Sequence, residues 1–145
     1  MIPHFDNEGN LPPGIHVTTW RELVSRFGHT EHRRRLTEGL KSALDALRAA
    51  GCKRVYVDGS FVTAKVEPGD FDGCWEVDGV DPGKLDPVPL TFSNRRAAQK
   101  AKYRGELFLA GAGADPAGTR FLEFFQHDKD GNAKGIIALD LRELP

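Results

Sequence analysis

Hydrophobic residues recur at three- and four-residue spacing between Glu31 and Ala50, which predicts one long amphipathic helix. Thr30 precedes the first turn as the expected N-cap, and Gly51 follows the last periodic residue as the expected stop. The opposite face of this helix is charged, and its run Arg33-Arg34-Arg35 is expected to be solvated. A shorter helix is expected just before it, from Thr19 to about Phe27.

After the long helix the pattern changes to short runs rich in β-branched and aromatic residues, which predict strands. Residues 1–17 contain Pro3, Pro12 and Pro13 and are expected to form an extended arm that lies on the core. The fold class predicted for residues 1–145 is a single α+β domain, with a mixed β-sheet and helices packed mainly on one face. The expected elements are strands at 54–58, 70–77 and 106–109, a helix at 93–103 capped by Ser93, and a C-terminal hairpin of 121–127 with 135–141.

Composition excludes several classes of protein without naming an activity. Twenty Lys and Arg against twenty-one Asp and Glu give a formal charge of −1, so the chain has no global field that draws it to nucleic acid. No apolar run reaches the roughly 18–20 residues that span a bilayer, so no membrane partner is expected. The two cysteines, Cys52 and Cys74, lie far apart, and a reduced cytoplasmic protein is the natural expectation.

The chemically informative segment joins two of the predicted strands. Gly59 and Ser60 follow the first strand, and Asp70 and Asp72 stand on the next. Residues two apart in a strand project from the same side, so the two carboxylates are expected side by side. Such a pair repels unless a cation lies between them, and Mg²⁺ prefers these hard oxygen ligands together with substrate phosphates. A backbone without a side chain at Gly59 and the hydroxyl of Ser60 suit a phosphate group.

A Gly-Ser pair followed after nine residues by Asp-x-Asp resembles the signature of the DNA polymerase β-like nucleotidyltransferases, in particular their minimal bacterial members. The resemblance covers about residues 55–108. It implies that Asp70 and Asp72 hold Mg²⁺ (or Mn²⁺) that carries a nucleoside triphosphate, the substrate. It also implies that Gly59 and Ser60 hold the terminal phosphates, and that a third carboxylate comes from a later strand.

Three residues compete for the place of the third carboxylate. Glu106 fits best, because the predicted helix precedes it, Gly105 turns the chain and Leu107 follows. Glu123 and Asp140 also lie in apolar runs and stay open as alternatives. Asp58, just before Gly59, is interpreted as a residue at the surface edge of its strand.

Positive charge concentrates between Arg95 and Arg104, just before Glu106. A solvated helix is the plain interpretation of this cluster. The more specific one is that Arg96 and Lys100 reach the triphosphate or an acidic acceptor such as RNA.

The whole chain is also similar to an uncharacterised bacterial family through Leu11–His16, Phe92–Tyr103 and Phe121–Gln126. Members of that family resemble parts of toxin–antitoxin or phage-defence modules. The working hypothesis is a transfer of a nucleoside monophosphate to a protein or RNA hydroxyl, with Glu106 completing the site and assisting as base. The alternative is a module of the same fold without catalysis, which acts through the partner protein of a toxin–antitoxin pair.

Overall fold

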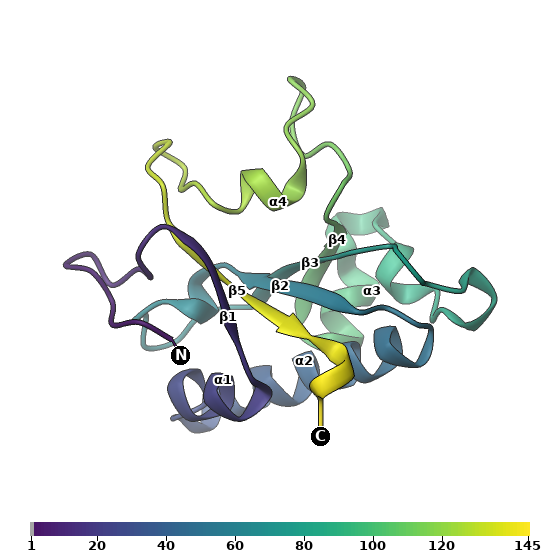
Figure 1. Cartoon of the computed structure of the whole chain (residues 1–145), viewed down its shortest axis with the longest axis horizontal. Helices are drawn as coiled ribbons and strands as arrows, with labels where there is room; N and C mark the ends of the chain where they lie inside the picture. Colours follow the sequence, from purple (N-terminus) through teal and green to yellow (C-terminus); the bar gives the residue numbers. More distant parts are fainter. Residues whose placement is uncertain (1) are drawn as a thin grey trace.

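The computed structural model describes residues 2–145 and contains one mixed β-sheet (Figure 1). Its five strands lie in the order β1-β5-β2-β3-β4. The outer pairs β1–β5 and β3–β4 are parallel, whereas β2 is antiparallel to both of its neighbours. The predicted single α+β domain with a mixed sheet is confirmed at this level. The strands are β1 (Gly14–Thr18), β2 (Arg54–Asp58), β3 (Phe71–Trp75), β4 (Gly105–Leu109) and β5 (Gly135–Asp140).

Two helices cover one face of the sheet. They are α1 (Trp20–Phe27) and α2 (Glu31–Ala49), and they lie on the side opposite α4 (Phe121–Phe124) in Figure 1. The predicted caps are confirmed, because Thr19 accepts a hydrogen bond from the Glu22 amide and Thr30 accepts one from the Arg33 amide. We call the face packed against α1 and α2 the helix-covered face, and the opposite one the cleft face.

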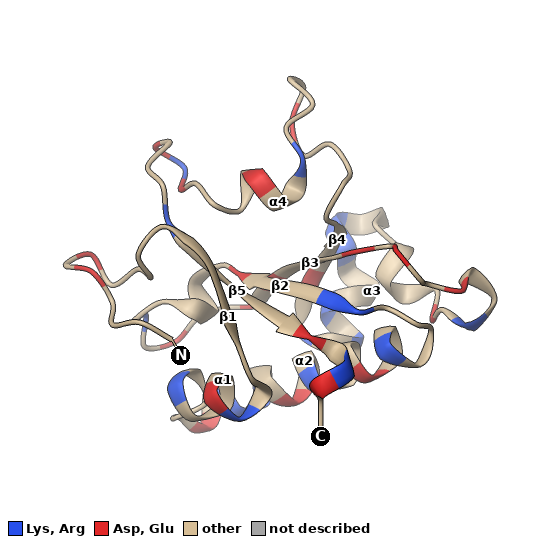
Figure 2. Cartoon of the chain, viewed as in Figure 1, with Lys and Arg blue, Asp and Glu red and all other residues tan. Residues whose placement is uncertain are grey.

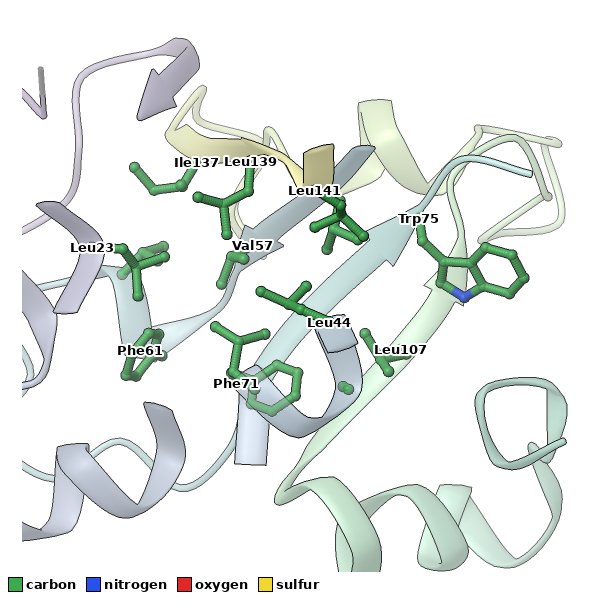
Figure 3. Packing of buried hydrophobic residues seen from close by; sticks show 14 of the residues in the cluster. Leu23, Leu44, Val57, Phe61, Phe71, Trp75, Leu107, Ile137, Leu139 and Leu141 are labelled. Atoms are coloured by element: carbon green, nitrogen blue, oxygen red, sulfur yellow. The ribbon is translucent and has the colours of Figure 1, made fainter. Parts of the chain in front are cut away.

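The main hydrophobic core lies between the helix-covered face and α2 (Figure 3). Strand side chains alternate between faces, so β2 sends Val55 and Val57 into this core and Tyr56 to the cleft face. A smaller apolar cluster on the cleft face contains Tyr56, Cys74, Phe125, Ile136 and Ala138. The cleft face is therefore only partly apolar, and its remaining positions carry the charged residues described below.

Arg33 corrects the expectation of a fully solvated basic run on α2. Its side chain is completely buried, and its guanidinium donates to backbone carbonyl oxygens instead of meeting water. The acceptors are the carbonyls of Phe27 (3.2 Å), Phe61 (2.7 Å), Thr63 (2.8 Å) and Lys65. Arg33 therefore holds the loop that follows β2 in one conformation. Burial lowers the pKa of this guanidinium.

Helix α3 (Ser93–Tyr103) begins differently from the prediction. Ser93 makes no capping hydrogen bond, and Asn94, Arg95 and Arg96 have left-handed backbone angles, with φ between 52° and 62°. Three successive residues other than glycine in this region cost about 1–2 kcal/mol each. Regular right-handed helix follows only after Arg96, so the segment that carries Arg96 is a strained turn.

Helix α3 lies along the outer edge of β4 and provides a hydrogen-bond partner for a backbone amide of that edge strand. The buried side chain of Gln99 accepts a hydrogen bond from the Leu107 amide (2.6 Å) and donates one to the Pro89 carbonyl (3.2 Å). The end of α3 also approaches α2 closely, because a Cβ on Gly39 would lie 2.0 Å from the Tyr103 carbonyl oxygen. These contacts fix α3 beside the sheet and bring its basic residues toward β4.

Two predicted elements are wrong. The expected C-terminal hairpin does not form, because residues 121–124 are helix α4 and β5 lies between β1 and β2. Phe121 and Phe125, one helical turn apart, both contact Phe108 on β4, and this packing favours helix over strand. The end of the predicted N-terminal arm is strand β1, while Ile2 and Leu11 before it are buried against the core as expected.

Candidate functional site

Three carboxylates form a row across the cleft face. Asp58 on β2 is in register with Asp72 on β3, and Asp72 is in register with Glu106 on β4. Residues in register on neighbouring strands project from the same face, with their Cβ atoms about 4.5–5.5 Å apart. The strands therefore bring Asp72 and Glu106 together, as the sequence predicted. They also place Asp58 beside Asp72, which the sequence did not predict. We call Asp58, Asp72 and Glu106 the carboxylate row.

Asp72 lies at the centre of this row and is the most perturbed of its members. Burial and the negative charges of Glu106, Asp58 and Asp70 raise the pKa of Asp72 to about 7. Gly59 lies directly against it, because a Cβ at Gly59 would stand 2.4 Å from Oδ2 of Asp72. Gly59 also has φ of 84°, so both its conformation and its surroundings require glycine. The Asp72 carboxylate therefore occupies the space that a side chain at position 59 would need.

Asp58 corrects the interpretation of a surface residue, since it is only 3% exposed. Its Oδ1 lies 3.2 Å from Nζ of Lys134, which directly precedes β5. Burial raises the pKa of Asp58, and the charge of Lys134 opposes that rise. The sequence-based interpretation of Asp58 as a surface residue is therefore wrong, and no sequence pattern had singled out Lys134. The alternation of side chains along a strand could have indicated the position of Asp58, because it places Asp58 on the same face of the sheet as Tyr56.

Glu106 is held by the two basic residues of α3 that the sequence had assigned to phosphate binding. Nζ of Lys100 lies 3.0 Å from its Oε1, and an Nη of Arg96 lies 3.4 Å from the same atom. Figure 2 shows basic residues of α3 close to β4. The structure therefore brings Lys100 and Arg96 to the carboxylate row, where they neutralise Glu106.

Asp70 and Ser60 lie at the two ends of the loop between β2 and β3. Burial raises the pKa of Asp70, Lys100 lowers it and Glu106 raises it, so Asp70 lies within electrostatic reach of the row. Ser60 begins a short 3-10 turn next to Gly59. The loop is attached to the first turn of α2 through Arg33 and through His32, which contacts the Pro68 carbonyl. Both ends of the predicted motif are therefore rigidly placed.

A cleft of about 850 Å³ opens over part of the carboxylate row. Asp58, Gly59 and Asp72 line its floor, and residues from α4 and from the loops on either side of it line the rest. Figure 1 shows α4 and these loops standing over the cleft face. The volume is within the roughly 300–1,000 Å³ that small-molecule sites occupy.

The two other candidates for the third carboxylate lie elsewhere. Asp140 is in register with Arg54 at the opposite end of β2, about 13 Å from Asp58 by strand geometry. It pairs with Arg142, which lowers the pKa of Asp140 to about 2. Glu123 is on α4 and lines a different hollow, beside Glu76. Of the three candidates, the structure places only Glu106 in the row with Asp72.

The carboxylates meet some of the requirements of a binding site for a hard divalent cation. Burial and mutual repulsion raise the pKa of Asp72, which is the state that a bound cation relieves. Within residues 2–145, however, no three His, Cys, Asp or Glu side chains are grouped as metal ligands, and Glu106 is engaged by Lys100 and Arg96. The oxygen donors fit Mg²⁺ by type, and Asp70, Asp72 and Glu106 are the residues that would hold it.

Comparison with protein families gives one match. The family model described as "Family of unknown function (DUF6932)" matches residues 3–140. The chain belongs to this family. The match includes the carboxylate row, the loop with Gly59 and Ser60, and helix α3, so the candidate site is part of the DUF6932 domain.

Searches of curated proteins and of solved structures find no match to the chain. In the part of the chain that the structure describes, residues 2–145, no helix is both long enough and apolar enough to cross a membrane.

Proposed function

We propose that this DUF6932 protein has a nucleotidyltransferase-like fold and transfers a nucleoside monophosphate from a nucleoside triphosphate to a hydroxyl of a protein or RNA. The observation that carries the proposal is the carboxylate row itself: Asp72 and Glu106 in register on adjacent strands, next to Asp70 and Gly59. Structural acidic residues rarely gather on one buried sheet face, because their repulsion destabilises the fold. A cluster of perturbed carboxyl groups beside a cleft is typical of a functional site.

In this proposal Asp70, Asp72 and Glu106 hold Mg²⁺, which supplies charge neutralisation for the triphosphate and the carboxylates. Gly59 lines the cleft and Ser60 follows it at the start of a 3-10 turn, and these two residues would hold the terminal phosphates. Lys100 and Arg96 supply positive charge at the opposite side of Asp72. The acceptor oxygen forms a bond to the α-phosphorus, pyrophosphate leaves with the electrons of the broken bond, and the hydroxyl proton passes to Glu106.

The test is a transfer assay with the four α-labelled nucleoside triphosphates, Mg²⁺ and total RNA or protein from a bacterial lysate as acceptor. Label should enter the acceptor with the wild-type chain and fall at least about a hundredfold with Asp72→Asn. Asp140→Asn serves as the matched control, because it changes a strand carboxylate at the far end of the sheet. Equal labelling by both variants and the wild type contradicts the proposal.

A second candidate function is binding of a partner protein without catalysis, as in one half of a toxin–antitoxin pair. The observation that favours it is the edge strand β1, where Ile15 and Val17 are 41% and 56% exposed. Exposed apolar residues on a free strand edge are typical of a surface that pairs with another chain. Replacing Val17 with Asp should then abolish co-purification of a partner and leave nucleotide transfer unchanged.

A further inference from the structure

A second, apolar hollow of about 210 Å³ lies on the other side of Glu106 from the cleft. It is lined by Phe92, Arg96, Phe108, Leu109, Ala112 and Phe121, and we call it the aromatic slot. Phe108 stands two residues after Glu106 on β4, so both side chains project from the cleft face. The slot is therefore continuous with the carboxylate row along one strand.

The rings in the slot share one orientation. The planes of Phe92 and Phe108 are inclined by 8° with centroids 6.2 Å apart, and those of Phe108 and Phe121 by 16° with centroids 4.4 Å apart. Phe92 is 41% exposed, so this stack ends at the surface rather than inside the core. A flat ring that enters the slot can join the stack in the offset-parallel arrangement that aromatic rings favour.

Arg96 adds a polar element to this apolar site. Its guanidinium lies 5.3 Å from the Phe108 ring centroid, and one of its nitrogens reaches Glu106. Its Nε is buried and has no hydrogen-bond partner within residues 2–145. The Arg96 side chain as a whole is 29% exposed, so its other guanidinium nitrogens can donate to an acceptor in or on the ring of a ligand. This favours a heteroaromatic ring over an alkyl chain, which carries no acceptor.

The slot is smaller than the roughly 300–1,000 Å³ of pockets that enclose a whole ligand. It accommodates one ring, while the rest of a larger molecule lies outside it. Arg96 contacts both Phe108 and Glu106, so this one side chain connects the slot to the carboxylate row.

We propose that the aromatic slot binds the nucleobase of the nucleoside triphosphate, stacked on Phe92 and Phe108 and hydrogen-bonded to Arg96. This inference rests on the proposed function, since it names the part of the same substrate that gives specificity. It assigns to α3 a role in selecting the nucleotide, in addition to neutralising Glu106.

The test compares two ligands that differ only in the presence of the nucleoside. Binding of each nucleoside triphosphate and of inorganic tripolyphosphate, both with Mg²⁺, is measured by calorimetry on the full chain. Phe92→Ala should weaken binding of the best triphosphate by about 5- to 150-fold, because stacking of one base on an aromatic side chain contributes about 1–3 kcal/mol. Its affinity for tripolyphosphate should not change. Phe92→Tyr should retain the wild-type affinity for the nucleotide.

Leu90→Ala is the matched control, since Leu90 is 46% exposed near the slot but does not line it. Equal effects of Phe92→Ala on both ligands, or no effect on either, overturn the slot assignment. If tripolyphosphate binding depends on Asp72 and the nucleoside triphosphates bind no more tightly than tripolyphosphate, the slot does not bind the base, but the proposed function stands.

A second measurement tests base binding in the aromatic slot independently of the proposed nucleotide transfer. Aromatic NMR signals of Phe92 and Phe108 are followed while the four uncharged ribonucleosides, or octyl glucoside as an alkyl-chain probe, are added. Shifts caused by a nucleoside support the slot even where no triphosphate binds, in which case the proposed function fails alone. Shifts caused by octyl glucoside and by no nucleoside overturn the slot as a base-binding site.

Discussion

The two faces of the sheet are built from the same strands but serve different purposes. On β4, Leu107 is fully buried on the helix-covered face, whereas its neighbours Glu106 and Phe108 face the cleft. On β3, Phe71 enters the main core and Asp72 joins the carboxylate row. The helix-covered face buries most of the apolar side chains, which stabilises the fold. The cleft face carries neighbouring charges, which lowers the stability of the fold.

This contrast indicates how the chain tolerates a row of carboxylates. The helix-covered face contributes the burial of nearly all large apolar side chains, and α2 fixes the loop at Gly59 through Arg33. The cleft face has only a smaller apolar cluster of its own, and the backbone register of the strands places its carboxylates. Substitutions on the two faces should therefore have opposite consequences for folding and for ligand binding.

The largest expected effect compares two adjacent residues of β4. Leu107→Ala should lower the free energy of unfolding by about 2–5 kcal/mol, because it removes a fully buried side chain and leaves a cavity. Glu106→Gln should change it by less than about 1 kcal/mol, because its ion pairs with α3 involve partly exposed partners. Urea denaturation measures both. A similar loss for both variants would remove the distinction between the faces.

The next effect concerns the buried arginine that supports the loop of the cleft face. Arg33→Met should lower the free energy of unfolding by about 3 kcal/mol, because several buried carbonyl oxygens lose their donors. Arg34→Met, on an exposed neighbour in the same helix, should change it by less than about 0.5 kcal/mol. Amide hydrogen exchange should also show loss of protection in residues 60–65 with the first variant only.

A third prediction concerns the pH dependence that the carboxylate row imposes. The folded protein retains the Asp72 proton up to a pKa of about 7, whereas the unfolded chain releases it near 3.8. The folded state binds more protons between these values, so the free energy of unfolding should fall as pH rises from 5 to 8 in the presence of a chelator. Asp72→Asn should reduce this fall by about 2–3 kcal/mol, since one pKa unit corresponds to about 1.4 kcal/mol. An unchanged slope in the variant would show that Asp72 is not perturbed.

The smallest effect distinguishes two lysines of the same helix. Lys100 pairs with Glu106 and lowers the pKa of Asp70, whereas Lys102 pairs with Asp86 away from the row. Lys100→Ala should raise the pKa of Asp70, measured by carboxyl NMR titration, while stability changes by less than about 1 kcal/mol. Lys102→Ala should leave the pKa of Asp70 unchanged. Equal shifts with both variants would mean that no specific contact connects α3 to the site.

The sequence predicted the helix-covered side of the molecule well, because local signals determine it. The caps Thr19 and Thr30 and the apolar stripe of α2 act within a few residues of one another. The placement of β5 between β1 and β2 depends instead on pairing between distant segments, which no local pattern encodes. The aromatic run at residues 121–125 has strand composition, yet its packing on Phe108 makes it a helix.

The candidate site was predictable where spacing and alternation determine it. The two predicted strands could place Asp72 near Gly59, and the helix before Glu106 could place that residue. Asp70 lies in the loop just before β3 instead of on the strand that the sequence predicted from residue 70. Asp58 was misjudged as a surface residue because its ion-pair partner, Lys134, is 76 positions away in the sequence. Arg33 was misjudged for a related reason: a charge run does not reveal that one of its members faces the carbonyl oxygens of a distant loop.

The most direct test of a metal–nucleotide site on the cleft face is a Mn²⁺ titration of the full chain at pH 8, followed by electron paramagnetic resonance with and without nucleoside triphosphate. We expect the triphosphate to increase the amount of bound Mn²⁺. Asp72→Asn should weaken Mn²⁺ binding by at least about tenfold, and Asp140→Asn should leave it unchanged. Equal Mn²⁺ affinity in the wild type and in Asp72→Asn would contradict a metal–nucleotide site on the cleft face.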